Sequence, residues 1–136
     1  MNCWIIKSEP STYSWEDLEK EKTTAWTGIR NFQARNYLKE MQKGDICLFY
    51  HSGQNKEIVG KCFVNCTFYK DPTTNDTNWV AVDIQHGEKI KKNITLEEIK
   101  ENPALKNIGL LRQQRLSVIK LTKEEYEELI KMSEKE

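Results

Sequence analysis

The apolar residues of this chain fall into short segments, some with the period of a strand and some with the period of a helix. Residues 3–7 are rich in β-forming side chains and end just before Glu9-Pro10, a dipeptide that disfavours continuation of a strand. Residues 46–50 form a continuous apolar run, which predicts a strand buried on both faces. Further strands are predicted over residues 58–69, 79–86 and 115–121, the last of them closing the sheet.

Two of these strands are expected to bury one face only. Along residues 58–69, the side chains that share a face are Ile58, Cys62, Val64, Cys66 and Phe68. Along residues 79–86, apolar residues at even positions alternate with a set that includes Trp79, Asp83 and Gln85. Because side chains on a strand alternate between its two faces, the polar face of this second strand is a candidate wall of a cavity.

Helices are predicted where a capping residue precedes a helical pattern. Ser14, with Asp17 three residues later, forms a capping-box signature and opens a short helix that ends near residue 20. A second helix is predicted over residues 31–41, because apolar side chains recur there every three or four positions. The capping-box signature returns at Thr95 with Glu98 and at Thr122 with Glu125, which predicts helices ending near residues 101 and 131.

The order of these elements favours one fold class. Five or six strands are interrupted by short helices, without the regular strand–helix alternation of a doubly wound sheet. The predicted class is α+β, a small, mixed and strongly curved β-barrel with peripheral short helices. With 136 residues and no Pro- or Gly-rich break, the chain is expected to form a single domain over residues 1–136.

The distribution of charge narrows the class of partner. The formal net charge is zero, which argues against a protein that coats nucleic acid by neutralising many phosphates. Residues 102–121 nevertheless carry Lys106, Arg112, Arg115 and Lys120 and no acidic side chain. A local basic face on a neutral protein is one interpretation, and an ordinary solvated charge run is the other.

The sequence also bears on compartment and on metal binding. No apolar run approaches the roughly 20 residues of a membrane-spanning helix, and a secretory signal is lacking, so we expect a soluble, cytoplasmic protein without a membrane partner. We expect a monomer, although the sequence leaves the oligomeric state open.

The four cysteines lie in apolar segments and are expected to be small buried hydrophobes. On a strand, Cys62 and Cys66 would lie roughly 13 Å apart, too far to share a zinc ion, so neither a metal nor a cofactor is expected.

Templates for catalysis are missing from the sequence. It contains no Gly-rich phosphate loop, zinc-type His/Cys cluster or nucleophile elbow. A Ser/His/acid set from Ser52, His51 and Asp83 is disfavoured, because adjacent residues at a strand end point in different directions. We therefore expect no catalytic residue and no enzyme. Lys7 with Glu9 is the pair on which a rival nuclease hypothesis would rest.

Side chains suited to hold a flat ring gather at the ends of the predicted elements. They occur in Lys7-Ser8, in residues 26–31, in Tyr50-His51-Ser52 and at Ser117. Trp26 and Tyr50 offer aromatic faces for stacking, worth roughly 1–3 kcal/mol per base, and the polar side chains offer hydrogen bonds to a ring edge. We therefore expect a hollow for a planar heterocycle beside Ser8 and His51, with the Trp26 indole as one wall.

Some of these residues have a structural alternative. His51 can be a turn residue, and Trp79 can either cover the barrel or stack on a ligand. Arg30 and Arg35 can lie in solvent, cap carbonyl groups, or contact phosphate or the pocket. Trp26 lies in a segment without a strong period, which favours a place in the pocket wall.

Several motifs follow one another along nearly the whole chain and resemble those of one family. They are Trp4-Ile5-Ile6-Lys7-Ser8-Glu9-Pro10, Trp26-Thr27-Gly28-Ile29-Arg30-Asn31-Phe32-Gln33-Ala34-Arg35-Asn36, Gly44-Asp45, Phe49-Tyr50-His51-Ser52, Val59-Gly60, Tyr69-Lys70-Asp71-Pro72-Thr73 and Arg115-Leu116-Ser117-Val118. In these motifs the chain closely resembles the EVE domain family. Ile29 and Phe32 depart mildly from the valine and tyrosine common in relatives, and should preserve the shape.

The resemblance implies a PUA-like fold, related to the PUA, ASCH and YTH modules, and a reader of a modified base in DNA or RNA. Modified cytosine in DNA is the leading candidate, as 5-methylcytosine or 5-hydroxymethylcytosine, taken into the pocket by base flipping. The residues assigned to the base pocket are Lys7, Ser8, Trp26, Arg30, Asn31, Tyr50, His51, Ser52, Trp79 and Ser117. Those assigned to phosphate contacts are Lys106, Arg112, Arg115 and Arg35.

Two rival functions stay open at this point. One is an enzyme of nucleic-acid processing, like the ribonuclease suspected among ASCH relatives, and the other is a sensor of a free nucleotide-like molecule. Nucleic acid carrying a modified base is the expected partner, and the resemblance adds restriction or RNA-modification proteins as further candidates. The chain begins almost directly at the domain, which favours a stand-alone microbial protein over a nuclear one.

Overall fold

A single mixed sheet organises residues 1–135, the part of the chain that the computed structural model describes. In chain order the elements are β1 (Cys3–Ser8), α1 (Trp15–Glu21), β2 (Thr23–Trp26), α2 (Phe32–Glu40), β3 (Ile46–His51), β4 (Glu57–Lys70), β5 (Val80–Thr95), α3 (Leu96–Glu101), the 3-10 helix η1 (Pro103–Leu105), α4 (Gly109–Arg112), β6 (Val118–Leu121) and α5 (Lys123–Glu134). The strand order is β2-β5-β4-β3-β1-β6, with β1 and β3 parallel and the other pairs antiparallel.

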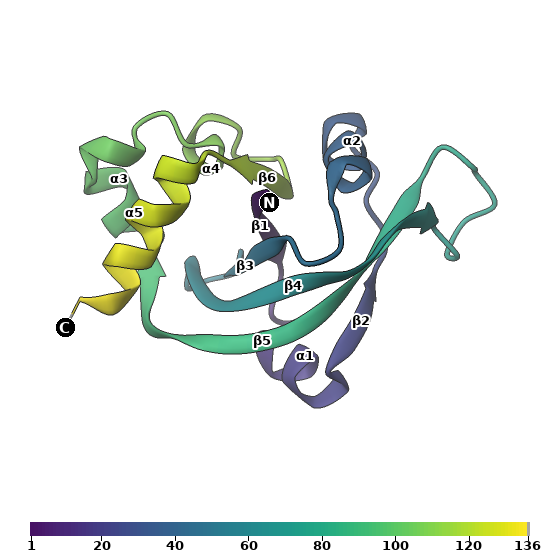
Figure 1. Cartoon of the computed structure of the whole chain (residues 1–136), viewed down its shortest axis with the longest axis horizontal. Helices are drawn as coiled ribbons and strands as arrows, with labels where there is room; N and C mark the ends of the chain where they lie inside the picture. Colours follow the sequence, from purple (N-terminus) through teal and green to yellow (C-terminus); the bar gives the residue numbers. More distant parts are fainter. Residues whose placement is uncertain (136) are drawn as a thin grey trace.

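The sheet is strongly curved, and its two edges do not pair with each other. β4 and β5 cross the molecule as two long bent strands, with α3, α4 and α5 gathered at one end and α2 toward the other (Figure 1). β2 and β6 are the edge strands of the order, so the barrel is open. The prediction of a mixed, strongly curved β-barrel of five or six strands with short peripheral helices is confirmed.

The helix starts follow the local capping signals closely. Each capping box is formed in both directions, at Ser14 with Asp17, Thr95 with Glu98, and Thr122 with Glu125. The first two helices behind these boxes end within one residue of the prediction, whereas α5 continues to Glu134 instead of stopping near residue 131. These boxes satisfy backbone N–H groups that have no partner inside the helix, so they can be recognised without knowledge of the tertiary structure.

Elements that depend on distant pairing were predicted less well. Strand β2 was missed, and it exists because Thr23–Trp26 pair along the edge of β5. β5 runs to Thr95 instead of ending at residue 86, because its Lys-rich second half pairs with the start of β4 and buries only Ile90 and Ile94. β6 begins at Val118, three residues later than expected, and the short helices η1 and α4 were also missed.

The prediction of one continuous buried face on β4 is wrong beyond Val64. Cys66 is exposed, and Phe68 is 45% exposed. The pairing of β4 with β3 ends at Phe63, and register irregularities around Cys66 interrupt its pairing with β5. The end of β4 therefore leaves the core as part of a two-stranded extension, which also overturns the expectation of burial for Cys66.

The core packs against both faces of the central strands. Trp4, Ile5 and Ile6 of β1 are all fully buried, and the Trp4 indole N–H donates to the buried Asp45 carboxylate at 3.1 Å. Ile5 and Leu48 face one side of the sheet, and Trp4, Ile6 and Phe49 face the other. On the face of Phe49, the Trp15 ring of α1 packs edge-on against Phe49 at an interplanar angle of 72° and covers Gly60, where any Cβ would lie 2.3 Å from the indole. None of the helices in residues 1–135 is long and apolar enough to cross a membrane.

Candidate functional site

The ends of β1 and β3 lie side by side and direct polar residues to two faces of the sheet. Lys7 stands opposite Tyr50, and Ser8 stands opposite His51. Because side chains alternate along a strand, Lys7 and Tyr50 belong to one face, and Ser8 and His51 to the other. The structure has a hollow on each side of this point, and Lys7 contributes to the lining of both.

We call the first hollow the indole pocket, because Trp26 is part of its wall. Its volume is about 390 Å³. The lining consists of Lys7, Ser8 and Glu9 from the end of β1, Thr12 and Tyr13 from the following loop, and Thr24, Ala25, Trp26, Thr27 and Ile29 from β2 and the loop behind it. Hydroxyl groups, one indole and small apolar side chains thus surround a space open to solvent.

The Trp26 indole is held in place by two other aromatic rings. It is 8% exposed, and its ring lies nearly perpendicular to Phe49, at 5.7 Å between centroids, and to Tyr13, at 6.1 Å. Phe49 is fully buried, so this contact joins the pocket wall to the core. A ring held on two sides keeps one orientation, which is what a stacking surface for a flat ligand requires.

The loop between β1 and α1 is fixed by its own hydrogen bonds. Ser8 Oγ donates to the Tyr13 carbonyl at 2.5 Å, and Tyr13 Oη donates to a Glu21 carboxylate oxygen. Burial and the hydrogen bond to Glu21 raise the pKa of Tyr13 to about 12, so its hydroxyl stays protonated at neutral pH. Tyr13 is therefore a neutral aromatic wall beside Trp26.

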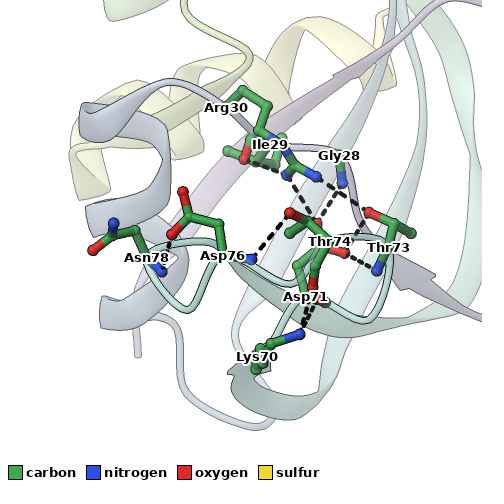
Figure 2. Close-up of polar contacts among 9 residues, drawn as sticks. All are labelled: Gly28, Ile29, Arg30, Lys70, Asp71, Thr73, Thr74, Asp76 and Asn78. Atoms are coloured by element: carbon green, nitrogen blue, oxygen red, sulfur yellow. Dashed lines mark hydrogen bonds and ion pairs between the residues drawn. The ribbon is translucent and has the colours of Figure 1, made fainter.

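Residues 27–30, which follow Trp26, are held by a buried carboxylate that lies 43 residues beyond Gly28 in the chain. Asp71 accepts from the Gly28 backbone N–H at 2.9 Å, from Arg30 Nη1 at 3.0 Å, and from both the backbone and the hydroxyl of Thr73 (Figure 2). Gly28 has a φ of +81°, a conformation that favours glycine. The loop that carries Thr27 and Ile29 into the indole pocket therefore depends on Asp71.

This carboxylate stays charged although its side chain is fully buried. Burial alone would raise the pKa of Asp71, but the hydrogen bonds from Thr73, Gly28 and Arg30 outweigh it and hold the pKa well below its usual range. The Arg30 side chain is 41% exposed and also donates to Thr73 Oγ1. The Arg30 guanidinium therefore stabilises the loop by binding Asp71 and Thr73 at the surface. It does not line the indole pocket.

The second hollow, which we call the basic cleft, has a volume of about 600 Å³. It lies between the ends of β1 and β3 and the helices α3 and α4, and it is lined by Lys7, Tyr50, Ser52, Lys56, Leu96, Glu97, Lys100, Leu110, Leu111, Gln114, Arg115 and Ser117. Lys7 Nζ donates to the Gln114 carbonyl at 2.8 Å and lies 5.9 Å from the Tyr50 ring centroid. Burial lowers the pKa of Lys7 and raises the pKa of Tyr50 to about 12.

The residues predicted for one pocket are thus distributed over both hollows and beyond. Lys7, Ser8 and Trp26 line the indole pocket, whereas Tyr50, Ser52 and Ser117 line the basic cleft together with Lys7. The others, His51, Asn31, Arg30 and Trp79, line neither of these hollows.

Each of these four side chains instead makes a contact that stabilises the fold. His51 Nε2 accepts from the Trp15 backbone N–H at 3.0 Å, which satisfies the first residue of α1. Asn31 caps α2 by accepting from the Ala34 N–H. Trp79 stacks on the exposed Phe32 with 5.1 Å between ring centroids, and the Arg30 guanidinium lies over the Trp79 ring, 5.7 Å from its centroid.

The residues predicted for phosphate contact are likewise separated. Arg115 lines the basic cleft, whereas Lys106 and Arg112 are exposed outside it, and Arg112 donates to Asn107. Arg35 lies on α2, over the Phe32 ring, and donates to Asn36 and to the Asn78 carbonyl.

Sequence reasoning missed part of the pocket wall for identifiable reasons. Thr24 and Ala25 lie on β2, whose pairing could not be seen in the sequence. Thr27 and Ile29 belong to the motif that begins at Trp26. The glycine between them, Gly28, has a positive φ, and its presence in the sequence was the available signal for a loop at this point. Tyr13, an aromatic residue in an otherwise polar loop, was the clearest signal left unused.

The catalytic alternatives gain no support from the contacts. Within residues 1–135 no ion pair joins Lys7 to Glu9; the Glu9 carboxylate instead accepts from the backbone and hydroxyl of Ser11. His51 and Asp83 have separate partners, since Asp83 accepts from Tyr69 Oη. The His, Cys, Asp and Glu side chains of the described chain form no group of three that could hold a metal ion.

A comparison with known families decides the relationship suggested by the motifs. The model of the EVE domain matches residues 2–132. The chain belongs to the EVE domain family. The PUA-like fold expected from the resemblance is confirmed by the sheet and by the solved structures that the chain resembles.

Relatives of this EVE domain are known from animals and bacteria. The chain is 34% identical to human thymocyte nuclear protein 1, over 98% of this chain and 74% of the human protein. The crystal structure of that human protein in complex with DNA containing 5-methylcytosine matches with a TM-score of 0.93 and 32% identity, over 100% of this chain and 99% of the other. A crystal structure from Agrobacterium tumefaciens matches with a TM-score of 0.95 and 38% identity, over 98% and 94% of the two chains.

The EVE fold also extends to a more distant module. The YTH domain of the Zygosaccharomyces rouxii MRB1 protein, solved with N6-methyladenosine RNA, matches with a TM-score of 0.60 over 97% of this chain and 86% of the other. The identity is 14%, so this likeness concerns the fold alone.

Proposed function

We propose that this EVE domain reads one modified nucleobase of a nucleic acid by holding it in the indole pocket. The observation that carries the proposal is the Trp26 indole, fixed by Phe49 and Tyr13, in the wall of an open hollow beside Ser8. The volume of about 390 Å³ lies within the roughly 300–1,000 Å³ range of small-ligand pockets. The human relative, solved with DNA containing 5-methylcytosine, supports the same class of ligand.

The lining suits a methylated cytosine. Ala25 and Ile29 offer apolar contact for a methyl group, and the indole of Trp26 offers contact for the ring. Thr24 and Thr27 also line the pocket, and their hydroxyls can hydrogen-bond the polar ring edge or the extra hydroxyl of 5-hydroxymethylcytosine. We place 5-methylcytosine in DNA first and the hydroxymethylated base second.

The base must leave the stack to enter such a pocket. In a duplex this base flipping costs a few kcal/mol, and stacking on Trp26 with hydrogen bonds in a partly desolvated pocket offsets it. The domain is then a binding module, not an enzyme, which agrees with the separate partners of Lys7 and Glu9. The cytoplasmic location, the monomeric state and any restriction or RNA-modification protein as partner stay predictions from the sequence.

The test compares two oligonucleotides that differ in one methyl group. Wild-type protein is titrated with 5-methylcytosine and cytosine versions of the same sequence, at stated salt, and the two dissociation constants give a selectivity ratio. Trp26→Ala should weaken binding of the methylated oligonucleotide by roughly 5- to 150-fold, the range that corresponds to 1–3 kcal/mol of stacking. Trp79→Ala, which removes an indole outside the pocket, is the matched control and should keep the ratio.

Loss of folding would mimic loss of stacking, because Trp26 is part of the core. Circular dichroism and thermal unfolding check each variant, and Trp26→Phe provides a version that keeps an apolar ring in place. Unchanged affinity of folded Trp26→Ala for the methylated oligonucleotide, or equal affinity of the wild type for both oligonucleotides, would contradict the proposal.

A further inference from the structure

The basic cleft has a charge imbalance that its own contacts do not remove. Its charged lining consists of Lys7, Lys56, Lys100 and Arg115 against Glu97 alone. Lys100 approaches Glu97 at 3.7 Å, but both side chains are more than half exposed, so this ion pair is weak. Neither Lys56 nor Arg115 forms an ion pair with a carboxylate of residues 1–135.

The inner end of the cleft carries polar groups that are partly removed from water. Lys7 is half-buried, and among residues 1–135 its ammonium contacts the neutral Gln114 carbonyl and the face of the Tyr50 ring, with no carboxylate beside it. Leu96, Leu110 and Leu111 form apolar parts of the wall. Because a positive charge near apolar walls is less screened than one in open solvent, an anion in this cleft is held more strongly than on an exposed surface.

The position of the cleft relative to the indole pocket indicates what kind of anion it takes. Lys7 lines both hollows, and its neighbour Ser8 lines the indole pocket. Lys7 is therefore at the edge that the two hollows share, at the end of β1. A nucleotide whose base lies beside Ser8 has its phosphate within reach of the Lys7 side chain and of the adjoining cleft.

The framework around the cleft holds these cations in place. The backbone N–H of Leu96, the first residue of α3, donates to the Lys56 carbonyl at 3.0 Å, which ties the loop before β4 to α3. The Lys7 backbone N–H donates to the Ser117 carbonyl at 3.0 Å, which ties β1 to the segment that carries Arg115. Cations from four separate segments of the chain thus face one space.

We infer that the basic cleft is a phosphate subsite for the strand that carries the read base, with Lys7, Lys56, Lys100 and Arg115 as its cations. The inference rests on the proposed function, because the indole pocket supplies the anchored nucleotide. It adds Lys56 and Lys100 to the residues that contact the ligand. These phosphate contacts position the strand for every sequence, while the indole pocket alone discriminates between bases.

The experiment measures how affinity depends on salt. Lys56→Ala, Lys100→Ala and the double variant are titrated with the 5-methylcytosine and cytosine oligonucleotides over a series of NaCl concentrations. Each lysine that contacts a phosphate should reduce the slope of log K against log salt by about 0.7–1. Both oligonucleotides should lose affinity by the same factor, so the selectivity ratio stays that of the wild type.

Lys131→Ala on α5 is the matched control, because it removes one exposed lysine that lines neither hollow. It should leave the salt slope unchanged. If the double variant behaves like Lys131→Ala, the inference is overturned. A loss of affinity confined to the methylated oligonucleotide would also overturn it, because phosphate contacts do not distinguish the two bases.

Free and polymer phosphate are separated by competition. Inorganic phosphate and 5-methyl-dCMP are titrated against the labelled oligonucleotide complex of wild type and double variant. Competition by 5-methyl-dCMP that is as strong as that of the oligonucleotide, and that is lost in the double variant, would assign the cleft to free nucleotides and overturn the strand subsite. The two proposals can fail separately. If the wild type does not distinguish the methylated from the unmethylated oligonucleotide, the proposed function fails, but the salt slopes of the lysine variants still show whether the cleft binds phosphate.

Discussion

At the scale of single residues, the buried carboxylate of Asp71 has the largest influence on the shape of the indole pocket. It lies 43 residues from Gly28 in the chain and accepts hydrogen bonds from both Gly28 and Arg30. Without these bonds the loop behind Trp26 would lose its attachment to the rest of the fold. Arg30 follows the pocket residues in the sequence, but its side chain does not line the pocket. It stabilises the loop that carries Thr27 and Ile29 by binding Asp71.

Replacement of Asp71 by asparagine is expected to destabilise the protein in a pH-dependent way. Asp71→Asn removes the charge that Arg30, Gly28 and Thr73 stabilise, which should cost about 3 kcal/mol in the free energy of unfolding at pH 7. The folded-state pKa of Asp71 is lower than its unfolded value, so its contribution is present above about pH 4 and is lost as the pH falls further. Urea denaturation at several pH values measures the difference between wild type and variant.

This difference should shrink on acidification below pH 4, because the unfolded wild type then binds a proton at Asp71 that the folded protein does not bind, and this favours unfolding of the wild type. Other carboxylates with lowered pKa values, Asp17 and Glu98, are common to both proteins and cancel in the comparison. A difference that stays constant from pH 7 to pH 2.5 would show that the charge of Asp71 contributes nothing.

At the scale of secondary-structure elements, the start of α2 separates structural from ligand-binding roles. Asn31 belongs to the motif that follows Trp26, yet its side chain accepts from the Ala34 N–H at 2.9 Å and is the N-cap of α2. The neighbouring β2 carries the pocket residues Thr24 to Trp26. One motif therefore contributes both to the pocket and to the support of a helix.

Removal of this cap should affect stability but not base selectivity. Asn31→Ala is expected to lower the free energy of unfolding by about 1 kcal/mol, because one N–H of the first turn loses its partner. Asn31→Ser, which keeps a capping oxygen, is the matched control and should recover most of the loss. Chemical denaturation gives the stability, and the ratio of affinities for methylated and unmethylated oligonucleotide should match that of the wild type. A change in that ratio with unchanged stability would contradict the capping role and indicate that Asn31 contacts the base.

At the scale of the whole molecule, the features that could be predicted from the sequence are those encoded locally. The capping boxes at Ser14, Thr95 and Thr122 were recognised because their partners lie three residues away. Trp26 and Ser8 were assigned to the pocket wall because aromatic and hydroxyl side chains stood at the ends of elements. These local signals were sufficient for the fold class and for part of the indole pocket.

The rest depended on contacts between residues distant in the chain. The role of His51 is set by the N-terminus of α1, 36 residues away, and that of Arg30 by Asp71, 41 residues away. The separation of Tyr50 from Ser8 follows from the register of the parallel pair β1 and β3, which places them on opposite faces. For this reason the sequence predicted one pocket where the structure has two hollows that share Lys7.

The central claim is that the modified base lies against the Trp26 indole, and NMR spectroscopy of a complex tests it directly. An oligonucleotide with one ¹³C-labelled methyl group on 5-methylcytosine is bound to this 16.0 kDa protein. We expect nuclear Overhauser contacts from the methyl protons to the ring protons of Trp26 or to the methyl groups of Ile29, and a methyl shift moved by the aromatic ring. A methyl signal at its free position, with contacts only outside the indole pocket while the complex is fully formed, would contradict the account.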